Sequence, residues 1–143
     1  MKILACIDNS EQSYKALGEA AKIAASMQEE VTVLYVEDPV PHPNDTGYYF
    51  SEESLKQYEK RRKKEMEALR AKVAGIFEEK NAKFNIMVKK GHPVQVITEV
   101  SAEGDYDVII MGNRGLGGFK KMLLGSVSSS VVQHAETSVF IVK

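Results

Sequence analysis

The chain lacks several features that would assign it to a class at once. Its 143 residues include one cysteine and no tryptophan, and 19 basic residues nearly balance 20 acidic ones for a formal net charge of −1. A single cysteine allows no disulfide within the chain, which favours a reducing compartment. A net charge near zero provides no general attraction to nucleic acid or to an anionic membrane, and we expect neither as a partner.

Long hydrophobic runs are also missing. No apolar stretch approaches the roughly 20 residues that a membrane-spanning helix needs. The apolar start of the chain reaches Asp8 too early for a secretory signal, whose apolar region takes about 7–15 residues plus a cleavage site. A hydrophobic fraction of 43% nevertheless supports an ordered core. We therefore expect a soluble cytoplasmic protein with one domain over residues 1–143.

Short apolar runs alternate with amphipathic segments along the chain. Strands are expected at Lys2–Asp8, Val31–Glu37, Phe84–Val88, Tyr106–Met111 and Thr137–Lys143. Helices are expected between them, beginning at Ser10, Ser51, His92 and near Val127. Five strands that alternate with four helices predict an α/β fold, a single doubly wound domain whose parallel sheet is covered by helices on both faces.

A glycine-rich stretch follows the fourth expected strand and ends where the fourth helix begins. Two residues separate Gly112 from Gly115, and nine separate Gly115 from Gly125, which Ser126 follows. Glycines let a backbone approach an anion closely, and the N–H groups of a helix N-terminus attract phosphate. The spacing fits neither a Walker A loop nor a dinucleotide fingerprint. It predicts a phosphate-binding loop of another kind, the alternative being a tight turn without a ligand.

The pattern G-x-x-G-x9-G-S resembles the ATP-binding branch of the universal stress protein family. Matching segments occur along nearly the whole chain, at residues 8–10, 91–93, 112–119 and 134–135. The resemblance implies a Rossmann-like five-stranded sheet of order 3-2-1-4-5. In that order the ligand crevice opens where the first and fourth strands end, beside Asp8 and Gly112. The motif and the topology thus indicate the same place.

Candidate binding residues fall into two groups. Phosphate binding is predicted for backbone and hydroxyl groups at Gly112, Gly115, Gly125, Ser126, Val127 and Ser128. Positive charge is available from Arg114, Lys120 and Lys121, each of which can instead be solvated.

The second group concerns the adenosine end of the ligand. The resemblance implies that Asp8 and the backbone near Val36 hold adenosine, and that Mg²⁺ or Mn²⁺ can accompany the phosphates of ATP. Val36 and Met111 are expected as apolar walls for the base. The alternatives are helix capping for Asp8 and ordinary core packing for the two apolar residues. No residue is assigned as a metal ligand.

Nothing in the sequence identifies a catalytic residue. His42, His92 and His134 lie in different expected elements and lack metal-ligand spacing. The leading interpretation is an ATP-dependent sensor or adaptor that hydrolyses ATP slowly or not at all and acts on an unidentified protein partner. The alternatives are a slow ATPase, self-phosphorylation within Ser126–Ser130, and a structural dimer without nucleotide.

Two surface segments complete the expectations. Residues 38–50 contain three prolines followed by Tyr48, Tyr49 and Phe50. They form either a lid over the site or an aromatic cluster that supports the long helix. The apolar run 139–142 is expected at a sheet edge, where an uncovered strand invites aggregation. The resemblance implies a homodimer formed through residues 137–143.

Overall fold

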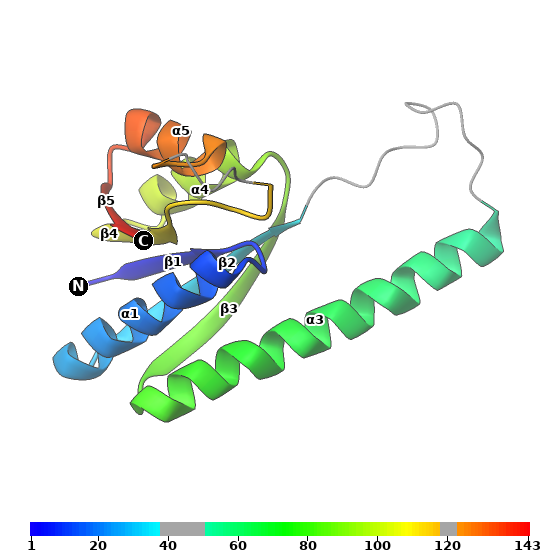
Figure 1. The fold of residues 1–143 in the computed structure, drawn as a ribbon, viewed down its shortest axis with the longest axis horizontal. Helices are drawn as coiled ribbons and strands as arrows, with labels where there is room; N and C mark the ends of the chain where they lie inside the picture. The colour runs from blue at the N-terminus through cyan, green and yellow to red at the C-terminus, as the bar shows by residue number, and fades with distance from the viewer. Residues whose placement is uncertain (38–50, 118–122) are drawn as a thin grey trace.

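A five-stranded parallel sheet forms the centre of the molecule (Figure 1). The computed structural model describes residues 1–37, 51–117 and 123–143. The strands are β1 (Ile3–Ile7), β2 (Glu30–Glu37), β3 (Lys83–Lys90), β4 (Val108–Gly112) and β5 (Ser138–Val142). The helices of these residues are α1 (Glu11–Met27), α3 (Glu52–Lys80), α4 (Pro93–Glu103) and α5 (Ser126–His134). The sheet order β3-β2-β1-β4-β5 confirms the predicted fold class.

Helices cover both faces of the sheet, α1 and α3 on one side and α4 and α5 on the other (Figure 1). Side chains of the central strand β1 therefore alternate between two cores. Ile3 and Ile7 pack with α1 and α3, whereas Leu4 and Cys6 pack with α4 and α5. All five residues of β1 are buried, which is why the strand reads as an unbroken apolar run.

The helix starts expected at Ser10 and Ser51 are confirmed, and both have side-chain caps. The Ser10 hydroxyl accepts a hydrogen bond from the Ser13 amide at 3.1 Å, and the Ser51 side chain does the same for the Ser54 amide. These bonds satisfy N–H groups that have no partner within the helix. Helix α5 begins one residue before the expected Val127, and Gly125 is its cap, without a side-chain capping bond.

Helix α3 runs well past the edge of the sheet (Figure 1). Its apolar stripe runs from Leu55 to Phe77, but only Leu69, Val73 and Phe77 are buried. Leu55 and Tyr58, on the same stripe, are 41% and 38% exposed. The sheet is shorter than the helix, so the first turns have no strand of the described residues to pack against.

Two sequence expectations lie partly or wholly outside the described residues. The lid or aromatic cluster at residues 38–50 is one, and the charges of Lys120 and Lys121 are the other. The structure shows no helix, among the residues it describes, with the length and apolar character needed to cross a membrane.

Candidate functional site

A cavity of about 700 Å³ opens at the carboxyl ends of β1, β2 and β4. Its walls come from these strand ends, the glycine loop, the first turn of α5 and the start of α4. The structure brings together every residue predicted to bind ligand: Asp8, Val36, Met111, Gly112, Arg114, Gly115, Gly125, Ser126, Val127 and Ser128. Their contact with a ligand remains a prediction, but their convergence on one cavity is a feature of the fold.

Asp8 forms the floor of this cavity at the point where β1 ends. One carboxylate oxygen, Oδ1, accepts a hydrogen bond from the Ser10 amide at 3.0 Å. The other, Oδ2, lies close to the glycine loop, because a Cβ built on Gly115 would stand only 2.5 Å from it. The loop therefore rests directly on the carboxylate, and glycine is what permits this approach.

Asn113 joins the two ends of the glycine loop. Its backbone carbonyl accepts hydrogen bonds from the Gly125 amide at 2.7 Å and from the Ser128 hydroxyl at 2.8 Å. Its side-chain amide donates to the Leu123 carbonyl at 3.1 Å, and its own amide donates to the Val142 carbonyl at 2.9 Å. Asn113 is buried. Sequence reasoning gave it no role, because only the folded loop brings its partners together.

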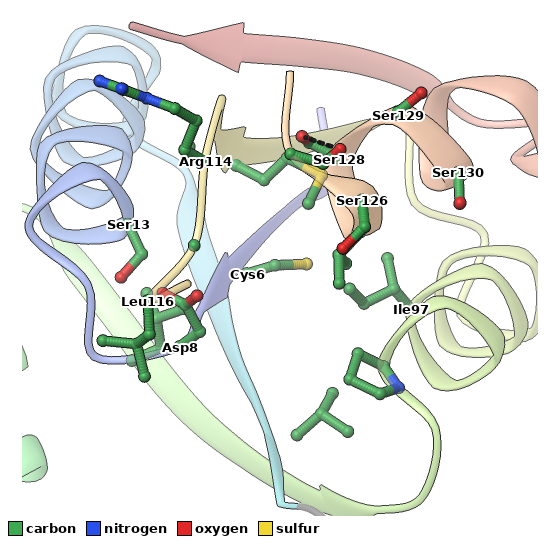
Figure 2. A pocket seen from close by; sticks show the side chains of 18 of the residues that line it. Cys6, Asp8, Ser13, Ile97, Arg114, Leu116, Ser126, Ser128, Ser129 and Ser130 are labelled. Atoms are coloured by element: carbon green, nitrogen blue, oxygen red, sulfur yellow. Dashed lines mark hydrogen bonds between the residues drawn. The ribbon is translucent and has the colours of Figure 1, made fainter. Parts of the chain in front are cut away.

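The first turn of α5 faces the cavity with its amide groups unpaired within the helix, as in any helix. The Ser126 hydroxyl points toward the cavity (Figure 2), whereas the Ser128 hydroxyl already donates to Asn113. Of the two predicted phosphate-binding hydroxyls, Ser126 is thus the one that faces a ligand without giving up a loop bond. The amides and the positive helix end suit an anion.

The remaining wall of the cavity is apolar. Cys6 from β1 and Ile97 from α4 face it from below and from the side (Figure 2), and Met111 and Val36 extend the same surface. Burial raises the pKa of the Cys6 thiol to about 12, so the group stays neutral and acts as a small apolar side chain. Cys6 lies two residues before Asp8, and strand alternation therefore placed both on one face.

Arg114 is the one positively charged residue among the described residues that line the cavity. Its backbone lines the cavity, but the guanidinium group points away from Asp8 and Ser126 (Figure 2). The Nε atom is buried and has no hydrogen-bond partner in the described parts of the chain. The predicted contact of Arg114 with phosphate therefore requires its side chain to turn.

The donor set does not form a resident metal centre. Across residues 1–37, 51–117 and 123–143, no group of three or more His, Cys, Asp or Glu side chains could hold a metal ion. Asp8 is the one carboxylate among the described lining residues. One carboxylate beside phosphates suits Mg²⁺ that arrives with the ligand, because Mg²⁺ usually keeps several waters and binds through substrate phosphates.

The histidines of the described residues lie outside the cavity lining. His92 and His134 are exposed, and the Nδ1 atom of His134 lies 2.8 Å from the Ser130 carbonyl in its own helix. The pKa of the Tyr14 hydroxyl is also raised. The main cause is its burial, and the nearby Tyr35 and Asp8 add to the effect.

Comparison with known sequences and with solved structures places the chain in a family. A sequence model described as the Universal stress protein family matches residues 1–143. Universal stress protein YxiE of Bacillus subtilis is 33% identical over 149 residues, covering 99% of this chain and 98% of the relative. The solved structure of universal stress protein UspA from Lactobacillus plantarum has a TM-score of 0.73 at 26% identity, covering 100% of this chain and 97% of that one.

A further solved structure carries a nucleotide. The universal stress protein from Archaeoglobus fulgidus in complex with dAMP has a TM-score of 0.67 at 20% identity, covering 100% of this chain and 98% of that one. At that identity the likeness shows a common fold, and the ligand is a property of the other protein.

Proposed function

We propose that this chain, which belongs to the universal stress protein family, binds ATP in the cavity at the ends of β1 and β4. In this proposal it acts as a nucleotide-dependent sensor or adaptor in the stress response. The observation that carries the proposal is the convergence of the glycine loop, the α5 N-terminus and Asp8 on one cavity. Its volume, about 700 Å³, lies within the roughly 300–1,000 Å³ typical of small-molecule sites.

The cavity has a polar end and an apolar end, as a nucleotide requires. The amides of the glycine loop and of the first turn of α5 would bind the phosphates. Asp8 would accept hydrogen bonds from the sugar, and Val36 and Met111 would contact the base. The dAMP held by the Archaeoglobus fulgidus structure supports an adenine nucleotide as the ligand class. Three or four charged hydrogen bonds, less the cost of ordering, suggest roughly micromolar affinity for ATP.

A binding role is favoured over rapid hydrolysis because the described lining offers no positioned base besides Asp8. Phosphoryl transfer also needs metal clamping and neutralisation of developing charge. Mg²⁺ or Mn²⁺ brought by ATP would supply charge neutralisation, and in that case Asp8 would share the metal instead of bonding the sugar. Self-phosphorylation is the second candidate, because the Ser126 hydroxyl faces the cavity (Figure 2).

We also propose that the chain forms a homodimer through residues 137–143. Strand β5 stands at the edge of the sheet, with β4 as its only neighbour within it. Phe140 on this strand is 45% exposed, and Val132 on α5 is 46% exposed. Pairing with a second β5 would satisfy the open backbone groups of the edge and cover Phe140.

A thermal-stability panel with ATP, ADP, GTP and NAD⁺ tests the ligand class. Saturating ATP at about 100 times its Kd should stabilise the fold by about 2.7 kcal/mol, whereas NAD⁺ should give no shift. Release of phosphate and transfer of labelled phosphate to protein are then measured on the same samples. A turnover above ~1 s⁻¹ with Mg²⁺ would replace the sensor proposal with an enzymatic one.

A further inference from the structure

The backbone of Arg114 is fixed at the phosphate end of the cavity. A Cβ built on Gly125 would lie 3.3 Å from the Arg114 Cα, so Arg114 begins beside the N-terminus of α5. The preceding residue, Asn113, is held by four hydrogen bonds, and the following residue, Gly115, rests on Asp8. The main chain therefore has little freedom here, and any change in the position of the guanidinium must come from side-chain rotation.

The side chain of Arg114 is not satisfied in the orientation that the structure shows. The guanidinium points away from the cavity (Figure 2), and its buried Nε–H lacks an acceptor in the described residues. Buried donors of this kind are rare, and each one calls for a physical explanation. The planar fork of an arginine matches phosphate oxygens, which would give Nε–H an acceptor.

For an electrostatic reason, the Arg114 guanidinium would take one position without ligand and another with polyphosphate bound. The N-terminus of α5 carries partial positive charge, so it repels a guanidinium that turns into the cavity alone. A bound polyphosphate reverses the sign of the local field, and the same rotation then becomes favourable. The amides of the loop and of the α5 N-terminus also favour an anion, but they are fixed in place. Among the described lining residues, only Arg114 carries a positive charge on a long side chain that can add to their attraction.

We infer that Arg114 is a rotating arm that pairs with the outer phosphates and makes the affinity of the site depend on phosphate number. This inference rests on the proposed nucleotide binding and names the residue that selects within it. Affinity should rise from adenosine through AMP and ADP to ATP. Part of that rise should come from the loop and α5 amides and part from the Arg114 guanidinium, and the part that depends on Arg114 should weaken as salt screens the interaction.

Calorimetric titration of ATP, ADP, AMP and adenosine tests this with three variants. Arg114→Gln removes the charge, Arg114→Lys keeps it without the fork, and Arg61→Gln removes the same charge from an exposed position on α3. We expect Arg114→Gln to lower ATP affinity roughly 10- to 100-fold and adenosine affinity less than about twofold. Arg114→Lys should fall between, and Arg61→Gln should match the wild type.

The possible outcomes distinguish a phosphate-binding role of Arg114 from a role in loop structure and from failure of the proposed nucleotide site. Equal losses of ATP and adenosine affinity in Arg114→Gln would show that the residue only maintains the loop, and unchanged ATP affinity would remove it from the site; either overturns the inference. A wild type that binds adenosine and ATP equally would overturn it as well. Failure of the wild type to bind any of the four ligands would reject the proposed function together with the inference.

Discussion

Gly115 is the residue at which the glycine loop and the end of β1 come closest. The Asp8 carboxylate cannot simply move aside for a larger residue, because its Oδ1 is held by the Ser10 amide. A Cβ at position 115 would stand 2.5 Å from Oδ2 and would lift the loop from the carboxylate. Overpacking of this kind costs about 1–3 kcal/mol, so we expect Gly115→Val to weaken ATP binding roughly 5- to 150-fold if the bound loop bears that cost.

The control for Gly115 is a glycine outside the cavity. A Cβ on Gly75, exposed on α3, would meet no atom within 4 Å. Gly75→Val should therefore bind ATP as the wild type does, measured by the same titration. Equal affinities for the two valine variants would show that contact between the loop and Asp8 is not needed for binding.

Cys6 provides a test at the residue scale that needs no ligand. Its pKa rises from 9.0 to about 12 on burial, so above pH 9 the unfolded chain loses this proton before the folded chain does. Stability attributable to the neutral thiol is complete below pH 9 and is lost as pH rises toward 12, by up to about 1.4 kcal/mol per unit. Urea unfolding of wild type and Cys6→Ala should show the stability difference shrinking from pH 9 to 11, whereas parallel curves would contradict it.

Single residues also show how far the sequence leads. The ten predicted binding residues all reach the cavity, because strand ends and glycine spacing fix their positions along the chain. The role of Asn113 and the outward direction of Arg114 were not predicted. Both depend on partners that are distant in sequence, such as Val142 for the Asn113 amide.

Among the elements, α3 is joined to the end of β2 by an ion pair between Arg62 and Glu37. The Nε atom of Arg62 donates a hydrogen bond to Oε1 of Glu37 at 2.8 Å, and its Nη2 atom donates to Oε2 of the same carboxylate. Hydrogen bonding to Glu37 raises the pKa of Arg62. The Glu37 side chain is only 10% exposed. We expect Arg62→Ala to lower the free energy of unfolding by about 1–3 kcal/mol in urea titrations.

Arg61→Ala is the control for this element, since Arg61 is exposed on the same helix. Its free energy of unfolding should stay within about 0.5 kcal/mol of the wild type. If the two alanine variants were equally stable, the ion pair would not hold the helix.

The sequence predicted where α3 begins and which face is apolar, but periodicity carries no information about where the sheet beneath a helix ends. The exposure of Leu55 and Tyr58 follows from that limit.

On the scale of the whole molecule, the edge at β5 is the surface through which we propose that two chains pair. Phe140 is exposed on that edge, and Tyr58 is an exposed aromatic residue on the distant helix α3. Phe140→Glu places a charge within the proposed interface and should convert the dimer to monomer at micromolar concentration. Tyr58→Glu should leave the dimer intact. Sedimentation of the wild type as a monomer would reject the homodimer.

The fold class followed from alternating strands and helices, whereas the strand order followed from the resemblance to the universal stress protein family. Association was less accessible, because an apolar edge strand shows that something must cover it without showing what does. The sequence alone did not distinguish a sensor from a slow ATPase or from a self-phosphorylating protein. That distinction depends on the chemistry of the site.

Calorimetric titration of ATP with Mg²⁺ into protein stripped of nucleotide tests the central claim most directly. Stripping is needed because nucleotide carried through purification would mask the heat of binding. The cavity formed by the glycine loop, Asp8 and α5 predicts saturable binding of about one ATP per chain with a roughly micromolar Kd. No heat and no stabilisation at millimolar ATP would contradict the account, since the loop and cavity would then be present without the ligand they are proposed to bind.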